Sequence, residues 1–452
     1  MARRKRSDRM RVGKVTLYSH HGAWWLYFSE GNRRVRRKVS DSLKDAEILA
    51  AQVNLQLTQG APTLLSFQPI SVADLRQHFL DYHEHVLKSS VATLVRYRAA
   101  TQHLENFVAQ QHRQPDAHQL RPDAFAAYLR QIEVAPNGHK NAKKRKLRDK
   151  GVCFILETCR SMYNYAFKRR HLPPYVGNPF SELPLERLKI EDAKPIFVFD
   201  EATELAFLRA ASDWAFPIHF TLAKTGLRIG EVTHLLIEDV DLVGGWLHVR
   251  NKTELGWRIK TGQERAVPLL PELIAVLRSV IGSRTAGLVF VRERFLGKTR
   301  KSYGERADLE RALQQSIDTC RSAAQVLGRA DIQRLARKVW WNAGAVKQDI
   351  IRQSFVRIMR LIGHPEATCP KSWRHSFATL LQDANVDPLI RQQTLGHKPT
   401  NGNGLGMTGS YTHTRPETQR QQIEQALRRW AASLLYACER IDAVPSETGT
   451  AQ

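Results

Sequence analysis

A proline-rich segment near the middle of the chain separates two regions whose sequence patterns differ. Proline lacks a backbone N–H and fixes φ, so no helix can continue through the prolines of this segment: Pro173, Pro174, Pro179, Pro184 and Pro195. A polar stretch with Gly60 and Pro69 marks an earlier break, and a chain of 452 residues is long enough for two or three domains. We therefore expect a module over 1–62, a domain over 70–175, a linker over 176–194, a domain over 195–436 and a flexible tail over 437–452.

The first module has a β pattern followed by a helical one. Apolar and polar residues alternate from 14 to 39, with turns at His21-Gly22 and Gly31-Asn32, which predicts a three-stranded antiparallel sheet. Ser42 and Asp45 resemble a capping box, and apolar residues then recur at helical spacing, so one helix should lie behind the sheet. Cations crowd the last strand and should project from it: Arg33, Arg34, Arg36, Arg37 and Lys38. They suit phosphate contacts or insertion into a DNA groove, although charge also protects a solvated edge strand.

The second domain has the pattern of a helical bundle. Helical periodicity covers about 71–87, 90–110, 121–132 and 150–169. Between the last two segments lies a basic run that contains Lys143, Lys144, Arg145 and Lys146. Such a run follows a phosphate backbone in a nucleic-acid-binding protein, or it forms a charged loop without a ligand. His83 and His85 do not share a helix face, so we interpret them as ordinary polar positions.

Charge and cysteine usage narrow the class of protein further. Lys plus Arg number 69 against 44 for Asp plus Glu, which gives a net charge of +25 and a pI near 10.1. This excess indicates DNA or RNA as the partner, with solubility as the alternative explanation. The five cysteines form no CxxC pair, and no run of eighteen apolar residues occurs. We expect a soluble, cytoplasmic, nucleoid-associated protein with no metal site, no disulfide framework and no membrane contact.

Beyond residue 195, helical patterns surround a short β region whose strands should come from DVDLVGGWLHVRN, GWRIKTGQERAVPL and GLVFV. Four short motifs stand out there. TGLRIGEVTHL places Arg228 at the start of a helix, and KSWRHSFATLL places Arg374 and His375 near the start of another. LGHKP offers His397 after a helix end, and GSYTHTRP contains Tyr411. Taken singly, each residue has an ordinary structural explanation, such as a solvated arginine or a surface tyrosine.

In this order and at this spacing the motifs resemble the tyrosine recombinase family, also called phage integrases, across the C-terminal half of the chain. The resemblance implies that Arg228 and Arg374 bind the scissile phosphate and that Glu231 accompanies Arg228. It also implies that Tyr411 is the nucleophile, while His397 matches the third-box histidine or tryptophan.

Three further residues are assigned by the same resemblance. The lysine that the family carries on a β-hairpin matches Lys260, and Lys252 competes for that role. His375 is a supporting residue beside Arg374. Lys371 departs from the pattern, because the family usually has a histidine there. A lysine is mostly protonated at neutral pH, so we favour a phosphate clamp at Lys371 over the alternative, a general base.

The chemistry explains these residue types. Attack on a phosphodiester builds negative charge on the nonbridging oxygens, and guanidinium groups are suited to hold it. The tyrosine hydroxyl is a weak nucleophile near neutral pH and needs a positive field and a proton acceptor. Lys260 on a mobile hairpin would protonate the departing 5′ oxygen, and His397 would bind the phosphate or assist proton transfer. The phosphotyrosyl bond conserves the energy of the broken link, so no ATP or other cofactor is expected.

The resemblance implies a multidomain fold that is mainly α with small β-sheets. Its parts are the N-terminal sheet-plus-helix module, similar to arm-site binding domains, a helical core-binding domain and a mixed, mostly α catalytic domain. The implied function is site-specific recombination or integration of double-stranded DNA through a 3′-phosphotyrosyl intermediate, for a mobile element. A homotetramer on DNA is expected, with accessory or co-encoded recombinase proteins as further partners. The alternatives are a type IB topoisomerase-like enzyme and a non-catalytic, sequence-specific DNA-binding protein.

Three stretches of the C-terminal half are considered separately: one exceeds the family pattern, and two are expected to act in assembly. About 75 residues separate LVFVRERF from KSWRH, and their periodicity predicts a helical insertion over about 296–362. Glycines from 402 to 409 precede Tyr411 and predict a mobile tether that orders on assembly. The helix near QRQQIEQALRRWAASLLYA is expected to dock on an adjacent protomer, unless it completes the core of its own protomer.

Overall fold

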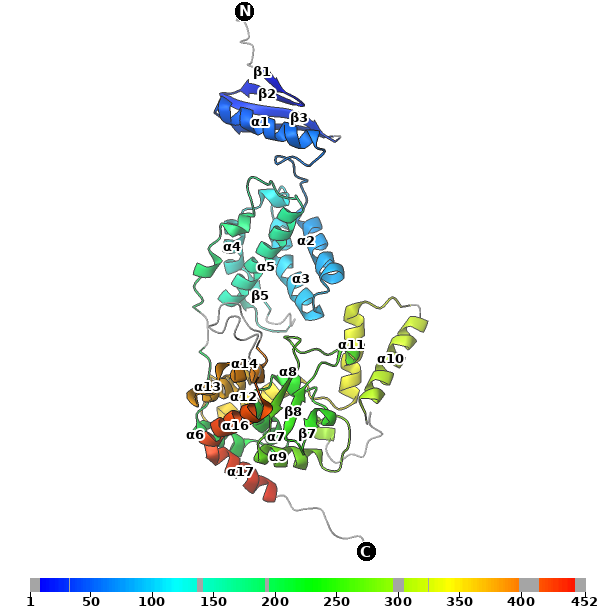
Figure 1. The fold of residues 1–452 in the computed structure, drawn as a ribbon, viewed down its shortest axis with the longest axis vertical. Coiled ribbons are helices and arrows are strands. Elements are labelled where there is room, and N and C mark those ends of the chain that lie inside the picture. The colour runs from blue at the N-terminus through cyan, green and yellow to red at the C-terminus, as the bar shows by residue number, and fades with distance from the viewer. Residues whose placement is uncertain are drawn as a thin grey trace, which may run out of the picture. The chain divides into compact units, whose positions relative to one another are not determined.

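The computed structural model describes residues 9–31, 33–135, 141–191, 195–295, 305–323, 325–397 and 414–443. The chain divides into two compact units, 1–194 and 195–452, and each is considered by itself. Both units are mainly α with small antiparallel sheets, which confirms the expected fold class (Figure 1). None of the helices in the described ranges combines the length and apolar character that a bilayer crossing needs.

Unit 1 opens with a four-stranded antiparallel sheet, covered on one face by α1 (Leu43–Thr58) (Figure 1). The strands follow chain order: β1 (Arg9–Val12), β2 (Val15–His20), β3 (Ala23–Glu30) and β4 (Arg33–Ser40). The expectation of three strands is wrong, because β1 is short and largely exposed and carries no clear alternation. The predicted capping box is also absent. Ser42 precedes α1 without a side-chain cap bond, and its N–H donates to Ser40 Oγ at 2.9 Å.

The two faces of this sheet differ in chemistry. Residues opposite each other in an antiparallel pair point to the same face, so the register assigns each strand residue to a side. Apolar side chains meet α1 in a small core: Val15, Leu17, Leu26, Phe28, Val35 and Val39. The other face, here called the open face, combines cations with aromatic rings: Arg9, Arg11, Tyr18, Trp25, Tyr27, Arg34, Arg36 and Lys38. Arg33 and Arg37 lie on the helix side, so the expected row of five cations is split between the two faces.

The second part of unit 1 is a helical domain. Its helices agree with the four predicted patterns: α2 (Val72–Asp81) continued by η1 (Tyr82–Val86), α3 (Val91–Ala109), α4 (Pro122–Gln131) and α5 (Asp149–Lys168). Two short strands, β5 (Glu133–Val134) and β6 (Arg145–Lys146), pair within the stretch that was expected to be a loop. Phe180 and Leu185 are buried in the core of this domain, so the segment after residue 176 packs against it and is not a free linker.

Unit 2 is built of helices around one small sheet. Its helices are α6 (Glu201–Ala210), α7 (Ala215–Thr225), α8 (Ile229–Val232), α9 (Pro271–Ile281), α10 (Arg306–Ser322), α11 (Arg329–Asn342), α12 (Gln348–Leu361), α13 (Lys371–Asp383), α14 (Pro388–Leu395), α16 (Pro416–Leu427) and α17 (Ala431–Asp442). The sheet has the order β7 (Val240–Asp241), β8 (Trp246–Val249) and β9 (Arg265–Pro268). The predicted GLVFV strand is wrong, because Leu288 and Val291 form only isolated bridges outside this sheet.

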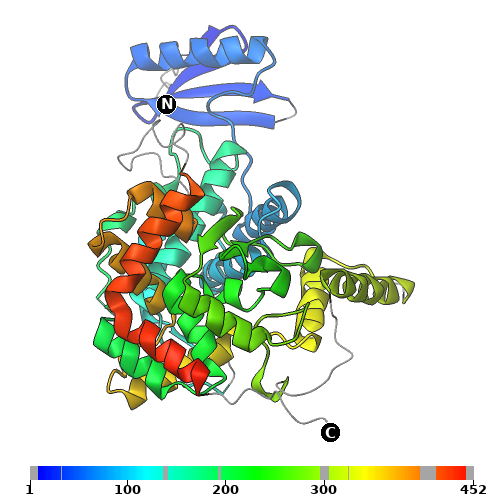
Figure 2. The same ribbon diagram turned by 60° about the horizontal axis from the view of Figure 1, so that its bottom comes forward.

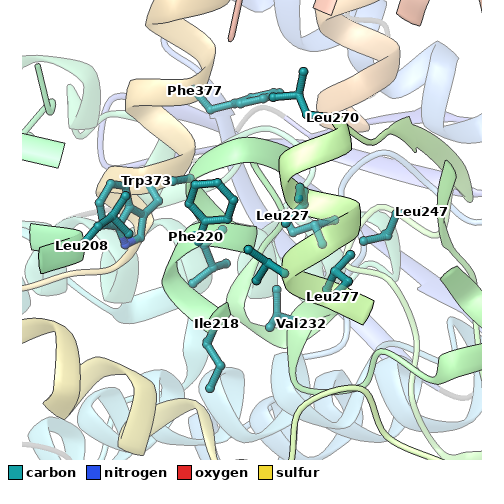
Figure 3. Close-up of a cluster of buried hydrophobic side chains, with 14 of the residues drawn as sticks. Leu208, Ile218, Phe220, Leu227, Val232, Leu247, Leu270, Leu277, Trp373 and Phe377 are labelled. Carbon is teal, nitrogen blue, oxygen red and sulfur yellow. The ribbon is translucent and has the colours of Figure 1, made fainter. Parts of the chain in front are cut away.

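The main core of unit 2 brings the motif-bearing elements together (Figure 3). Trp373 of α13 stacks on Phe199, with ring centroids 3.9 Å apart. Gly226 ends α7 with φ of +61°, and a Cβ at this position would collide with the ring of Phe377. Glycine is required there because the left-handed backbone strains other residues and the space is filled. The contact sets the start of α13 beside the turn that leads into α8.

The C-terminal helices α16 and α17 complete the core of their own unit. Their buried residues include Ile423, Ala426, Leu427, Leu434 and Ala437. Ser433 Oγ accepts from the buried Lys224 Nζ at 2.7 Å, which ties α17 to α7. The apolar stripe of this region therefore packs within its own unit, and docking on an adjacent protomer stays a prediction. The tail expected from residue 437 also starts too early, because α17 extends to Asp442.

Helices α10 and α11 form a hairpin at the edge of unit 2, here called the inserted hairpin (Figure 1, Figure 2). Its apolar side chains share a separate cluster with the β region: Leu236, Leu255, Leu288, Leu309, Leu313, Ile317, Ala336, Val339, Trp340 and Ala345. Helix α12 instead buries Ile351, Phe355 and Met359 in the main core. The insertion expected over 296–362 is therefore narrower and excludes α12.

Candidate active site

Arg228 stands at the N-terminus of α8, two residues after the glycine turn that ends α7. Glu231 directs its carboxylate back toward it: Oε1 accepts from Arg228 Nη1 at 2.9 Å, and Oε2 accepts from the Arg228 backbone N–H at 2.8 Å. The Glu231 side chain is 3% exposed, whereas that of Arg228 is 24% exposed. Glu231 thus holds Arg228, whose other guanidinium N–H groups have no partner among the described residues.

Arg265, at the start of β9, forms further hydrogen bonds with Glu231. Its Nη2 donates to Oε2 at 2.7 Å and its Nη1 to Oε1 at 3.2 Å, while its Nε donates to the Thr394 carbonyl at 2.8 Å. Burial alone would raise the pKa of Glu231, but the hydrogen bonds and charges of Arg265 and Arg228 outweigh it and lower that pKa. The sequence motifs did not reveal this residue. The one feature of the sequence that could have indicated Arg265 is its position in the same predicted hairpin as Lys260.

Arg374 lies in the first turn of α13 and is 7% exposed. Its Nη1 donates to the Gly226 carbonyl at 2.7 Å, and its Nη2 donates to the Leu395 carbonyl. These carbonyls lie at the C-terminal ends of α7 and α14, where helices leave acceptors unsatisfied and favour positive charge. Burial, followed by the like charge of Arg228, lowers the pKa of Arg374 to about 9. The guanidinium therefore stays protonated at neutral pH.

His397 follows α14 after Gly396, which has φ of +62°. Its backbone N–H donates to the Gln392 carbonyl at 3.1 Å. The residue is exposed, yet partial burial of the ring, followed by the charges of Arg374, Arg228 and Arg265, lowers its pKa below the usual value. A neutral imidazole at pH 7 is able to accept a proton.

The two candidate lysines differ in their surroundings. Lys252 is 2% exposed, and its Nζ pairs with Asp239 at 2.8 Å, so its charge is already balanced inside the protein. Lys260 is exposed, and no hydrogen bond or ion pair joins its Nζ to a described residue. Asn251 holds the turn around it, since Oδ1 accepts from the Ile259 N–H at 3.0 Å and Nδ2 donates to the Gly262 carbonyl at 3.0 Å. Lys260 is the lysine available to a substrate.

Lys371 opens α13 and is exposed, and its ammonium has no hydrogen bond or ion pair with a described residue. His375 lies one turn later on the helix. Burial, followed by the charges of Lys371 and Arg374, lowers the pKa of His375. Lys371 therefore neighbours His375, whereas the contacts that assemble the arginine cluster do not involve it.

Tyr411 and the glycines from 402 to 409 lie outside the described residues, so the nucleophile remains a prediction from the motif. Within the described ranges, no three His, Cys, Asp or Glu side chains are grouped as a metal site would need.

The cations predicted to bind DNA lie on three surfaces of unit 1: the open face of the N-terminal sheet, its helix side and the region of β6. On the open face, Arg36 donates to Tyr18 Oη and lies 5.2 Å from the Tyr18 ring centroid and 5.6 Å from that of Trp25. Arg9 and Arg11 share this face, and they were not predicted as DNA-binding residues because no strand was expected at β1. In the helical domain, all four residues of the basic run at β6 are exposed: Lys143, Lys144, Arg145 and Lys146.

Residues 210–418 match the model of the phage integrase family, a range that contains the motif residues from Arg228 to Tyr411. The tyrosine recombinase XerA of Pyrococcus furiosus is 23% identical over 205 residues, 45% of this chain and 52% of that protein. The tyrosine recombinase XerC of Pelobacter propionicus is 28% identical over 193 residues, 43% of this chain and 45% of that protein. The matched segments thus span about half the length of these curated relatives.

Among solved structures, the Tn1549 transposon integrase in complex with circular intermediate DNA has a similar fold, with a TM-score of 0.50. The similarity covers 78% of this chain and 99% of that one, at 16% sequence identity. At this identity the likeness establishes the fold alone.

Proposed function

The chain belongs to the tyrosine recombinase family, and from this premise we propose that it cuts and rejoins double-stranded DNA through a covalent bond between Tyr411 and a 3′ phosphate. The observation that carries the proposal is the arginine cluster. Arg228 and Arg265 pair with the single carboxylate of Glu231, and Arg374 donates to the nearby carbonyls of Gly226 and Leu395, so the largely buried site has a net positive charge. A scissile phosphate, which becomes more negative on attack, would be stabilised there.

The three arginines would have different roles. Arg228 and Arg374 keep N–H groups without a protein partner among the described residues, and these would bind the nonbridging oxygens. Arg265 directs Nε, Nη1 and Nη2 at protein acceptors. We therefore assign Arg265 a positioning role, in which it holds Glu231 and the end of α14 in place.

The proposed reaction balances without a cofactor. The Tyr411 hydroxyl oxygen attacks phosphorus, the P–O bond to tyrosine forms, and the P–O5′ bond breaks. The tyrosine proton passes to neutral His397 or to water, and the Lys260 ammonium gives a proton to the departing 5′ oxygen. A 5′ hydroxyl of another strand then reverses these steps. One phosphate ester replaces another at each stage, so no ATP is consumed.

Lys371 would act as a phosphate clamp. It is exposed at the N-terminus of α13, two residues before the stacked Trp373, and no described carboxylate neutralises it. Its neighbour His375 has a pKa lowered by burial first and then by Lys371. A lysine that carries a positive charge suits electrostatic contact with DNA better than acceptance of a proton.

DNA binding would extend over unit 1. We assign the open face of the N-terminal sheet to duplex contacts, because its cations stand among aromatic rings and no strand residue on that face is acidic. The exposed cations at β6 would contact DNA phosphates. We further propose that the chain acts inside the cell as a homotetramer on DNA, serves a mobile element and works with accessory proteins.

The decisive experiment is covalent capture on DNA. Tyr411→Phe removes only the nucleophilic oxygen and should abolish the protein–DNA adduct on a nicked substrate while duplex binding stays nearly intact. Tyr436→Phe is the matched control, since it removes a phenolic oxygen from α17, and its adduct yield should equal that of the unaltered protein. An adduct that persists in Tyr411→Phe would place the nucleophile elsewhere.

Exchange of partners separates recombination from simple relaxation. With two differently labelled duplexes that carry the flanking DNA of the gene, the unaltered protein should produce strands joined across the two labels. Relaxation of supercoils without such joint molecules would favour the topoisomerase alternative. DNA binding without any adduct would favour a non-catalytic protein.

A further inference from the structure

The inserted hairpin contacts the loop that carries Lys260. Between β8 and β9, the consecutive residues Glu254, Leu255, Gly256 and Trp257 all meet it. The indole N–H of Trp340 donates to the Leu255 carbonyl at 2.9 Å, with Trp340 3% and Leu255 1% exposed. A buried hydrogen bond of this kind holds a backbone segment in a defined position, because an unmet carbonyl would be costly.

Two further contacts hold residues 254–257 against the inserted hairpin. Gly256 has φ of +66°, and a Cβ built on it would lie only 2.7 Å from Ala336 Cβ, so the loop backbone rests directly on α11. At the edge, Arg306 of α10 pairs with Glu254 at 2.8 Å. The first part of the loop is thus seated on the inserted hairpin, and Lys260 follows Trp257 by three residues.

A cluster of three aromatic rings connects the loop and the inserted hairpin to α8. The Trp257 ring stacks on the His234 ring, with centroids 5.1 Å apart and planes 18° apart. The Trp340 ring meets the His234 ring edge-on, with centroids 4.8 Å apart. His234 Nδ1 lies 2.9 Å from the Gly230 carbonyl of α8. Burial, the largest cause, lowers the pKa of His234 to about 4, so the ring packs as a neutral aromatic group. One cluster therefore connects the inserted hairpin, the lysine loop and the helix that begins after Arg228.

We propose that Trp340 is a positioning residue for Lys260, and that the inserted hairpin sets the reach of the Lys260 ammonium toward the 5′ oxygen. This inference rests on the proposed function, since it takes Lys260 as the proton donor. The long lysine side chain transfers a proton only if its backbone stem is held, and misplacement by about 1 Å slows such steps strongly. The main core of unit 2 holds the stem through buried Ile259, and Asn251 holds its turn. The hairpin supplies the remaining support.

The test compares two DNA substrates in single-turnover cleavage. One has the natural bridging 5′ oxygen, and the other has sulfur at that position. A thiolate, with a pKa near 8.5 for its conjugate acid, leaves without the proton that an alkoxide requires. Trp340→Phe keeps a ring but removes the N–H. It should slow cleavage of the oxygen substrate by about threefold to tenfold, the loss expected for one hydrogen bond, and leave the sulfur substrate unaffected.

Three further variants make the result decisive. Gly256→Ala, which would push the loop off Ala336, should reproduce the selective loss. Ile317→Ala removes volume from the same cluster away from the loop and should slow neither substrate. In Lys260→Ala, adding Trp340→Phe should cause no extra loss on the oxygen substrate.

Failure of the inference and failure of the proposed function look different. If Trp340→Phe and Gly256→Ala slow both substrates equally, or slow neither, while sulfur rescues Lys260→Ala, Trp340 does not position Lys260. If sulfur fails to rescue Lys260→Ala, Lys260 is not the proton donor and the premise itself is wrong.

Discussion

The arginine cluster of unit 2 and the open face of the N-terminal sheet both concentrate positive charge, but they do so in opposite ways. Arg374 is 7% exposed and the Arg265 side chain 5%, and both donate to defined protein acceptors. Arg34, Arg36 and Lys38 are exposed, and Arg36 lies against aromatic rings. Burial holds a guanidinium in one geometry, whereas exposure leaves it hydrated and adaptable.

This difference predicts a division of labour. A charge that stabilises a transition state must be in place before the reaction, because reorganisation would add to the barrier. A charge that attracts DNA gains mainly from the release of counterions, for which exact placement matters less. Changes in the cluster should therefore alter the rate of cleavage, and changes on the open face should alter affinity and its dependence on salt.

The largest effect is expected in the cluster. Arg228→Ala and Arg374→Ala should each slow adduct formation at saturating protein by about a hundredfold or more, the size found for loss of one oxyanion-stabilising donor. Duplex binding should change little, and EDTA should have no effect. Arg209→Ala, an exposed arginine on α6, is the control and should cleave normally. Cleavage that depends on Mg²⁺ would contradict the two-arginine account.

The open face gives the next largest effect, on binding. Arg34→Ser with Arg36→Ser should weaken duplex binding by about tenfold or more at moderate salt and reduce the slope of log K against log salt by about two, one per lost phosphate contact. The matched control is Arg33→Ser with Arg37→Ser on the helix side of the same strand, which should leave the slope unchanged. If the two double variants have the same slope of log K against log salt, the open face is not the part of the sheet that contacts DNA. Cleavage at saturating protein should be unaffected in both.

Lys371 should give a smaller effect that does not depend on pH. Lys371→Met should slow single-turnover cleavage by about fivefold to tenfold, as expected for loss of one charge-assisted contact at an exposed site, and Lys371→His should retain activity. The factor should be similar at every pH, since a clamp takes no part in proton transfer. A pH profile that changes shape in Lys371→Met would support a general base instead.

The smallest predicted effect concerns the acidic limb of the pH profile. The pKa of His397 lies below 6.5 because of partial burial and then the arginine charges, so the ring is neutral at pH 7 and gains a proton only at lower pH. Protonated His397 cannot accept the tyrosine proton, so the cleavage rate should fall only as pH drops through that lowered pKa. His397→Asn should abolish this limb. A limb with its midpoint above 6.5, or one unchanged in His397→Asn, would assign it to another group.

Local signals in the sequence were enough to locate most of the helices and the motif residues on them. The four helical segments of unit 1 carry long amphipathic patterns, and the structure has helices in each of them. The TGLRIGEVTHL motif predicted a helix start at Arg228, and α8 does begin there, two residues after Gly226 ends α7. The same signals failed for β1 and for GLVFV, because short strands depend on pairing partners that periodicity does not name.

The sequence by itself determined the positive charge of the protein, the order of its helical and β segments, and a set of residues whose types suit phosphoryl transfer. Only the tertiary structure decided which charges are buried and which elements meet. It paired Arg265 with Glu231, neutralised Lys252 with Asp239, and packed the C-terminal helices into their own unit. It also seated the Lys260 loop on the inserted hairpin. The physical reason is that helix starts and turns arise from neighbours along the chain, whereas burial and ion pairing arise between segments far apart in it.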